Sequence, residues 1–155
     1  MRETSGYVRR FPLYLRHITG IDAVKAAKEL LEQQHSETIV KIGEMDDNIK
    51  SLEKAISAKQ GPLATCQMKI QQRKARPNVE LVVDDVEHQL HAEAQNLVDN
   101  INKLEMCLVK SKNSFASLQK SRLELENQIA VKANSIYIDE VKCMTIRQSV
   151  QHQAF

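Results

Sequence analysis

The side chains best suited to holding a metal lie in one short stretch, where Asp84 is followed by Glu87, His88 and His91. Two histidines three residues apart share a helix face, and imidazole is a common zinc ligand. The HExxH order of zinc enzymes is absent, however, and the spacing fixes no third ligand. Acidic residues at a helix start also complement the helix dipole, which accounts for the same residues without a metal. The sequence therefore predicts no metal site.

A basic run, KIQQRKAR at residues 69–76, is the stretch best suited to binding phosphate. Single-stranded nucleic acid is usually bound by basic grooves that also present aromatic side chains, and this run has none. The formal net charge of +2 is too small to favour nucleic acid or a membrane surface. Nucleic-acid binding through this run therefore remains only a weaker alternative.

Patterns that would indicate catalysis or a cofactor are absent from the sequence. It holds no Gly-rich nucleotide loop, no nucleophile elbow and no convergent pair of carboxylates. Its longest uncharged apolar run falls far short of the ~20 residues of a membrane span. The cysteines Cys66, Cys107 and Cys143 are odd in number and form no CxxC, which favours free thiols in a reducing, intracellular location. We therefore expect no catalytic residue, no cofactor and no membrane.

The composition favours long helices over a compact core. Gly and Pro together number seven and only six residues are aromatic, whereas Lys, Glu, Gln, Ala, Leu and Ile dominate. Residues 1–18 are basic, and Pro12 and the lack of an apolar stretch there argue against a secretory signal. We expect residues 1–18 to be a basic N-terminal extension, and a first long helix over residues 19–75 with a kink near 61–62.

Two series of positions repeat with alternating steps of three and four residues, which is the coiled-coil period. We call them the first and second seam series, and eleven members of each are apolar. The first series contains Ile21, Val24, Lys28, Leu31, His35, Thr38, Ile42, Met45, Ile49, Leu52, Ile56, Lys59, Leu63, Cys66, Ile70 and Arg73. The second contains Val83, Glu87, Leu90, Ala94, Leu97, Ile101, Leu104, Leu108, Ser111, Phe115, Leu118, Arg122, Leu125 and Ile129. Because Arg76-Pro77-Asn78 separates the two series, we expect two long helices of matched length to form a hairpin.

The distribution of charge favours an antiparallel hairpin. Residues 54–76 hold six bases and no acid, and residues 77–102 hold six acids and no Lys or Arg. The distal halves reverse this arrangement, with seven acids against three lysines in residues 22–47 and six bases against three acids in residues 103–132. Parallel helices would place like charges together, so this pattern selects the antiparallel orientation. His35, at a seam position, is interpreted as a polar residue that sets register.

The second long helix is expected over residues 83–133. Asn134-Ser135 then predicts a turn, and Asp139 a cap for a short helix, so residues 134–155 are assigned to a turn and a short C-terminal helix. The predicted fold class is all-α, a long antiparallel coiled-coil helical hairpin with a short C-terminal helix.

Residues 76–84 read RPNVELVVD and resemble RPNVELCRD, the signature nonapeptide of the tektin family. The matching residues are Arg76, Pro77, Asn78, Val79, Glu80, Leu81 and Asp84. The stretches GPLATCQMKIQQRKARP and KANSIYIDEVKCMTIR are also similar to tektin sequence, so the resemblance covers roughly residues 20–147. Val82 and Val83 replace the family's Cys and Arg, so neither a thiol nor a positive charge acts at those positions. Tektins are also longer and carry two such helix pairs, of which this chain resembles the second.

The resemblance implies that residues 76–82 form the tektin-type loop and that the chain is structural and not an enzyme. It implies a filament-forming microtubule inner protein that reinforces axonemal doublet microtubules in cilia and flagella, on which the motility of cilia and sperm depends. The implied partners are other tektins, tubulin and other microtubule inner proteins. We expect the seven matching residues to form a protomer-contact loop, with Val79 and Leu81 as apolar anchors. The alternatives are a turn staple at these two residues and a cytoplasmic coiled-coil adaptor that binds partner helices.

Overall fold

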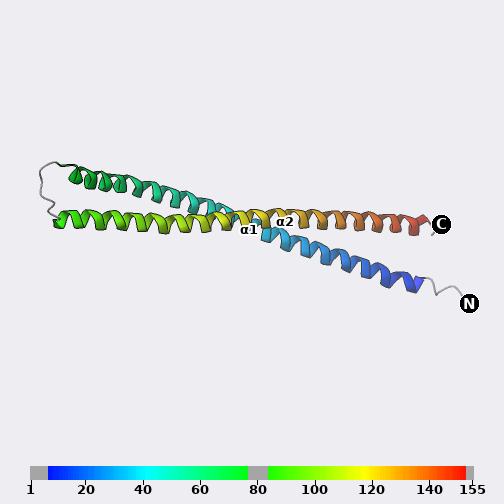
Figure 1. Ribbon diagram of the computed structural model, residues 1–155. Helices are drawn as coiled ribbons and strands as arrows, with labels where there is room; N and C mark the ends of the chain where they lie inside the picture. The colour runs from blue at the N-terminus through cyan, green and yellow to red at the C-terminus, as the bar shows by residue number, and fades with distance from the viewer. Residues whose placement is uncertain (1–6, 77–83, 153–155) are drawn as a thin grey trace, which may run out of the picture. The chain divides into compact units, whose positions relative to one another are not determined.

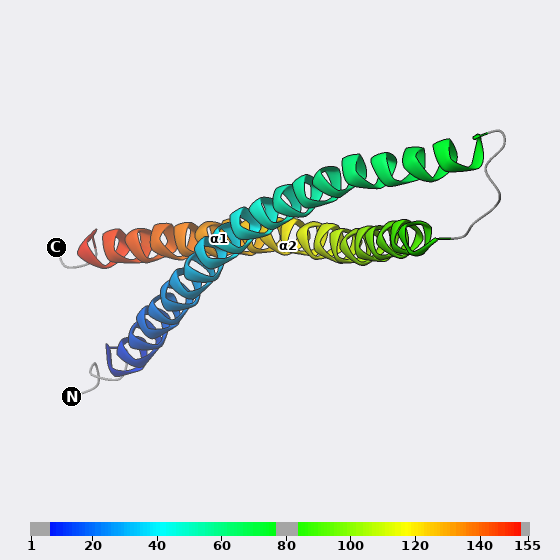
Figure 2. The same ribbon diagram turned by 90° about the vertical axis from the view of Figure 1, so that its left-hand side faces the viewer.

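Two long helices account for the regular structure in a computed structural model that describes residues 7–76 and 84–152. Helix α1 spans Tyr7–Lys74 and helix α2 spans Asp85–His152, and each has 68 residues, or about 100 Å at the standard rise per residue. Figures 1 and 2 show both as unbroken ribbons, α1 from blue to green and α2 from green to red. No β-strand occurs within the described ranges. The predicted all-α class is confirmed.

The chain divides into two compact units, each built from a part of both helices. Unit 1 combines Met1–Val40 with Gln119–Phe155, and unit 2 is Lys41–Leu118. In unit 1, Lys25 Nζ lies 2.8 Å from Glu140 Oε1, and His35 Nε2 lies 3.1 Å from Glu126 Oε1. A later residue of α1 therefore meets an earlier residue of α2, which makes the pair antiparallel.

Unit 2 is antiparallel by the same criterion. Its interhelical ion pairs join Glu53 Oε1 to Lys112 Nζ at 2.9 Å and Arg73 Nη1 to Asp84 Oδ1 at 2.7 Å. The end of α1 and the start of α2 lie at the same end of this unit in both views (Figures 1 and 2). The predicted antiparallel packing of the two helices is confirmed within each unit.

Burial follows the two predicted seams. Each of the sixteen members of the first series is buried or half-buried, and so is every member of the second series within the described residues. The most buried side chains are Ile21, Ile56, Cys66 and Ile101, all of them seam positions. A pair of helices shields one stripe of each helix and leaves the remaining faces in solvent, which explains why so few residues are fully buried.

The predicted start of the first long helix at residue 19 is not a boundary. Helix α1 already begins at Tyr7, so it includes most of the predicted basic extension. The hydroxyl of Thr19 donates to the carbonyl of Arg16 at 3.0 Å, which satisfies this side chain inside the helix instead of at a cap. The helix also passes through Gly61 and Pro62 without interruption, and the hydroxyl of Thr65 donates to the Gly61 carbonyl at 3.1 Å. The kink there stays a prediction.

The predicted turn at Asn134-Ser135 and the separate C-terminal helix are wrong, because α2 continues to His152. The hydroxyl of Ser135 donates to the carbonyl of Val131 at 3.0 Å, so this residue is accommodated within the helix. The three-four stepping also continues, since Lys132, Ile136, Asp139 and Cys143 are half-buried. Because Lys132 and Asp139 are charged, apolar side chains alone do not reveal this part of the seam.

Candidate protomer-contact site at the helix connection

The end of α1 and the start of α2 both carry charges suited to a helix terminus. The last turn of α1 contains Arg73 and Lys74, and the first turn of α2 contains Asp85 and Glu87. Bases at a helix C-terminus and acids at an N-terminus both interact favourably with the helix dipole. One further backbone bond, from the Ala75 amide to the Gln71 carbonyl at 3.1 Å, closes α1. Both helix ends that border the connection are therefore stabilised by the charges in their terminal turns.

Asp84 caps helix α2. Its Oδ1 accepts a hydrogen bond from the backbone amide of Glu87 at 2.9 Å, and its carbonyl accepts from the amides of Glu87 at 3.0 Å and His88 at 3.3 Å. Aspartate is among the preferred residues at this position because its short side chain reaches the free amides of the first turn. The last residue of the tektin-like nonapeptide therefore fixes where α2 begins.

The same carboxylate binds the end of α1. Arg73 Nη1 donates to Asp84 Oδ1 at 2.7 Å, and Nη2 donates to Oδ2 at 3.4 Å. We call this contact the Arg73–Asp84 clasp. Its side chains are 33% and 44% exposed, so the pair is partly shielded from water and should contribute more than a fully exposed ion pair.

The clasp shifts the ionisation of both partners. The hydrogen bond from Arg73 lowers the pKa of the Asp84 carboxyl below its usual range, and the bond from the Glu87 amide lowers it further. In return, the hydrogen bond to Asp84 raises the pKa of the Arg73 guanidinium. Both groups therefore stay charged at neutral pH, and the clasp is intact there.

The structure describes two of the seven predicted contact residues. Arg76 is exposed just after α1, and Asp84 is half-buried and turned toward Arg73 of the same chain. Five of the predicted contact residues lie outside the described residues: Pro77, Asn78, Val79, Glu80 and Leu81. Of the predicted loop at residues 76–82, only Arg76 is described. Arg73 is not among the predicted contact residues. In the sequence it is distinguished only as a basic residue at a seam position close to Pro77.

Cys66 is a buried thiol in the seam of unit 2. This thiol is 4% exposed, and it lies near the side chain of Glu93 of α2. Burial raises the pKa of the Cys66 thiol, and the nearby Glu93 carboxylate raises it further. Cys66 is therefore a protonated packing residue, while Cys107 is exposed and Cys143 half-buried.

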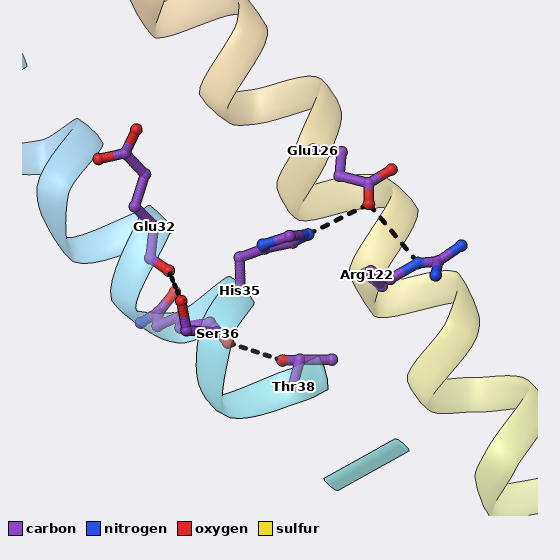
Figure 3. A network of polar contacts seen from close by, with 7 residues as sticks. Glu32, His35, Ser36, Thr38, Arg122 and Glu126 are labelled. Carbon is purple, nitrogen blue, oxygen red and sulfur yellow. Dashed lines mark hydrogen bonds and ion pairs between the residues drawn. The ribbon is translucent and has the colours of Figure 1, made fainter. Parts of the chain in front are cut away.

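His35 takes part in a polar layer of unit 1. Its Nε2 lies 3.1 Å from Glu126 Oε1, and Arg122 Nε approaches the same oxygen at 3.5 Å (Figure 3). Arg122 Nε is buried and has no hydrogen-bond partner. Figure 3 shows the His35 ring reaching from α1 toward α2, which is the placement that its predicted role in setting register requires.

The residues considered for a metal site lie near the start of α2. His91 Nε2 lies 3.8 Å from Glu87 Oε1, too far for a hydrogen bond. The described ranges contain no group of three or more His, Cys, Asp or Glu side chains placed to hold a metal ion. Within those ranges no helix is both long and apolar enough to cross a membrane.

Comparison with known proteins agrees with the nonapeptide resemblance. Residues 19–151 match the model of the Tektin family. The chain is 41% identical to Tektin-4 of Xenopus laevis over 126 residues, which are 81% of this chain and 28% of that protein. It is 35% identical to Tektin-4 of Bos taurus over 126 residues, with the same two shares, and 37% identical to Tektin-4 of Mus musculus over 117 residues, which are 76% and 26%.

The chain therefore spans about a quarter of the length of these relatives. The matched region contains both seam series, the Arg73–Asp84 clasp and the nonapeptide-like stretch at residues 76–84. Since the family match covers most of the sequence, the chain belongs to the tektin family.

Proposed function

We propose that the chain is a filament-forming structural protein of tektin type that lies inside axonemal doublet microtubules of cilia and flagella. The observation that carries this proposal is the family match over residues 19–151, a range that holds both helical seams. Tektins form a structural cytoskeletal family and not a family of enzymes, so the chain is not an enzyme. The proposed partners are other tektins in the same filament, together with tubulin and other microtubule inner proteins. Reinforced doublets would support the motility of cilia and sperm.

Fractionation of ciliated cells tests this proposal. A tagged chain should remain with the axonemes after extraction with detergent and then salt. A cytoplasmic adaptor that binds partner helices would be released by the same treatment. Release of most of the chain into the soluble fraction would therefore contradict the proposal, and an image of the tag within a doublet microtubule would support it directly.

Within the filament, we assign head-to-tail contact between protomers to residues 76–84. Val79 and Leu81 serve as the apolar anchors, and Arg76, Glu80 and Asp84 set the register. A turn requires only the Pro-Asn pair, whereas the tektin-like sequence extends well beyond it. End-to-end contact between different surfaces that does not close into a ring produces a filament.

Replacing both Val79 and Leu81 with Ser tests the anchors. We expect helicity and the melting temperature to stay near their original values, because the seams that hold the helices together are untouched. Incorporation into axonemes should be lost, since the apolar contact to the next protomer is removed. Helicity and melting are measured by circular dichroism. If the double variant melts much earlier, these residues are a turn staple instead, and normal incorporation with normal melting would also exclude the contact.

A further inference from the structure

Helix α2 has large apolar side chains on its outer face over residues 130–145, in unit 1. The seam face of this segment is partly charged, since Lys132 and Asp139 occupy seam positions beside Ile136 and Cys143. The opposite face is uncharged, and we call it the α2 outer stripe: Ala130, Val131, Asn134, Tyr137, Ile138, Val141 and Met144. Every member of the stripe is exposed. An amphipathic surface helix normally places its apolar residues inside and its charges outside, so this segment shows the reverse distribution.

The spacing of the stripe indicates what kind of structure can cover it. Val131, Asn134, Ile138 and Val141 follow steps of three, four and three residues along α2. This is the period of a coiled-coil seam, which keeps a row of side chains facing a second helix over successive turns. We therefore expect the stripe to pack against a helix that lies along α2.

Charge excludes the more polar outer faces of this chain as the matching surface. In unit 1 the outer face of α1 exposes the acids Asp22, Glu29 and Glu37. Near its start, the outer face of α2 exposes Asp85 and Asp99. Packing the stripe against either face would remove these carboxylates from water without supplying a partner, which is costly.

Two other outer faces carry fewer charges but are poorer matches for a row of bulky side chains. The face of α1 over residues 57–72 is uncharged, yet Met68 is its one large exposed apolar side chain. Met106 and Val109 are exposed on α2 in unit 2, but Lys110 borders them. Among the outer faces that the structure describes, the α2 outer stripe is therefore best matched by itself.

We propose that the α2 outer stripe binds the same stripe of a second copy of this chain, with the two α2 helices antiparallel. The inference names one partner within the proposed assembly with other tektins, and it rests on that proposed function. A self-complementary surface forms a twofold contact to which both copies contribute the same residues. With the twofold axis near Ile136, Val131 of each copy lies beside Val141 of the other, and Asn134 lies beside Ile138.

The antiparallel orientation follows from the charge at the edge of the stripe. Lys142 is exposed and directly follows Val141. A parallel pair in register would place the two Lys142 side chains at the same level, where like charges repel. In the antiparallel pair, Lys142 of one copy lies near Ala130 of the other, so the length of the contact separates the two lysines.

The test measures self-association of the full chain by sedimentation velocity over a range of concentrations. Val131→Glu/Val141→Glu places acids on both sides of the paired positions. Val131→Lys/Val141→Glu places opposite charges there, since position 131 of each copy faces position 141 of the other. Leu30→Glu/Val40→Glu is the matched control, because these two side chains are 56% and 60% exposed on the other helix of the same unit.

We expect Val131→Glu/Val141→Glu to raise the dissociation constant of the pair by at least about tenfold, because it removes apolar contacts and brings like charges together. Val131→Lys/Val141→Glu should recover most of the lost association, which a parallel pair in register would not allow. Leu30→Glu/Val40→Glu should associate as the original chain does. Circular dichroism should show the same helicity for every variant, since none of the four positions belongs to a seam.

Three results would overturn the inference. The first is an original chain that stays monomeric at about 100 μM, where even a weak contact is partly occupied. The second is a dissociation constant that Val131→Glu/Val141→Glu leaves unchanged, and the third is an absence of recovery in Val131→Lys/Val141→Glu.

Extraction of axonemes separates the failure of this inference from that of the proposed function. A chain that is retained in axonemes but monomeric in solution would show that only the pairing is wrong. If Val131→Glu/Val141→Glu is then lost from axonemes, the stripe binds a different protein. A chain that pairs in solution through the stripe but is released from axonemes would contradict the proposed function and leave the pairing established.

Discussion

At the scale of single residues, Asp84 shows how one motif position can hold two helices. The sequence identifies Asp84 as the ninth residue of a tektin-like stretch and as part of an acidic helix start. The sequence does not reveal that Arg73 is the ion-pair partner of Asp84, because no sequence pattern specifies which polar side chains meet in the folded chain. The role of Arg73 depends on a tertiary contact across eleven positions.

The Asp84 carboxyl predicts a pH dependence of stability. Its pKa is lowered in the folded chain by Arg73 and the Glu87 amide, whereas the pKa of an unfolded Asp is about 3.9. The stabilisation is therefore complete above that value and is lost as the pH falls through the lower folded pKa. Melting followed by circular dichroism between about pH 6 and pH 2 should show the advantage of the original chain over Asp84→Asn shrinking below about pH 4. A difference between the two that is the same throughout would contradict this assignment.

At the scale of elements, the seams and the helix ends beside Pro77 could be predicted from the sequence, but the outer helix ends could not. A seam repeats over many turns, so its period survives single polar members such as His35 and Arg73. Helix ends depend on one or two residues, and Thr19 and Ser135 bond to carbonyls of their own helix instead of capping. The same side chain chemistry serves both purposes, and only the surrounding packing decides between them.

The antiparallel register of unit 2 predicts a specific crosslink. Cys66 lies near Glu93 across the helices, so Glu93→Cys, in a background with Cys107→Ser and Cys143→Ser, should be joined to Cys66 by a short thiol-specific crosslinker. Mass spectrometry should find the link within one chain. Ala92→Cys is the control, since its neighbouring position on α2 lies on a different face and should react much less. Links formed exclusively between two chains would instead indicate an extended dimeric rod.

At the scale of the whole molecule, the seams of the two units differ in composition. The seam of unit 1 includes the charged or polar residues Lys28, His35, Thr38, Arg122 and Lys132. Unit 2 has longer apolar runs, and three of the four most buried residues belong to it: Ile56, Cys66 and Ile101. Polar seam residues specify register at a cost in stability.

Helix α2 also exposes large apolar side chains within unit 1. They are Leu123, Val131, Tyr137, Ile138, Val141, Met144 and Ile146. These side chains are exposed in the single chain and are therefore available for the proposed assembly with other chains.

The difference between the seams leads to a prediction about hydrogen exchange. We expect the amides of unit 1 to exchange about tenfold faster than those of unit 2, because local opening requires less free energy where fewer apolar contacts are broken. The peptides to compare cover residues 24–38 and 122–135 in unit 1, and residues 45–56 and 97–108 in unit 2. The variant His35→Leu replaces a polar seam residue with an apolar one and should slow exchange in unit 1 while leaving unit 2 unchanged. Mass spectrometry of the exchanging chain in its unassembled form measures both effects. Two outcomes would contradict this prediction: equal amide protection in the two units, or faster exchange in unit 2. Either would show that the polar layer at His35 sets register without lowering the stability of unit 1.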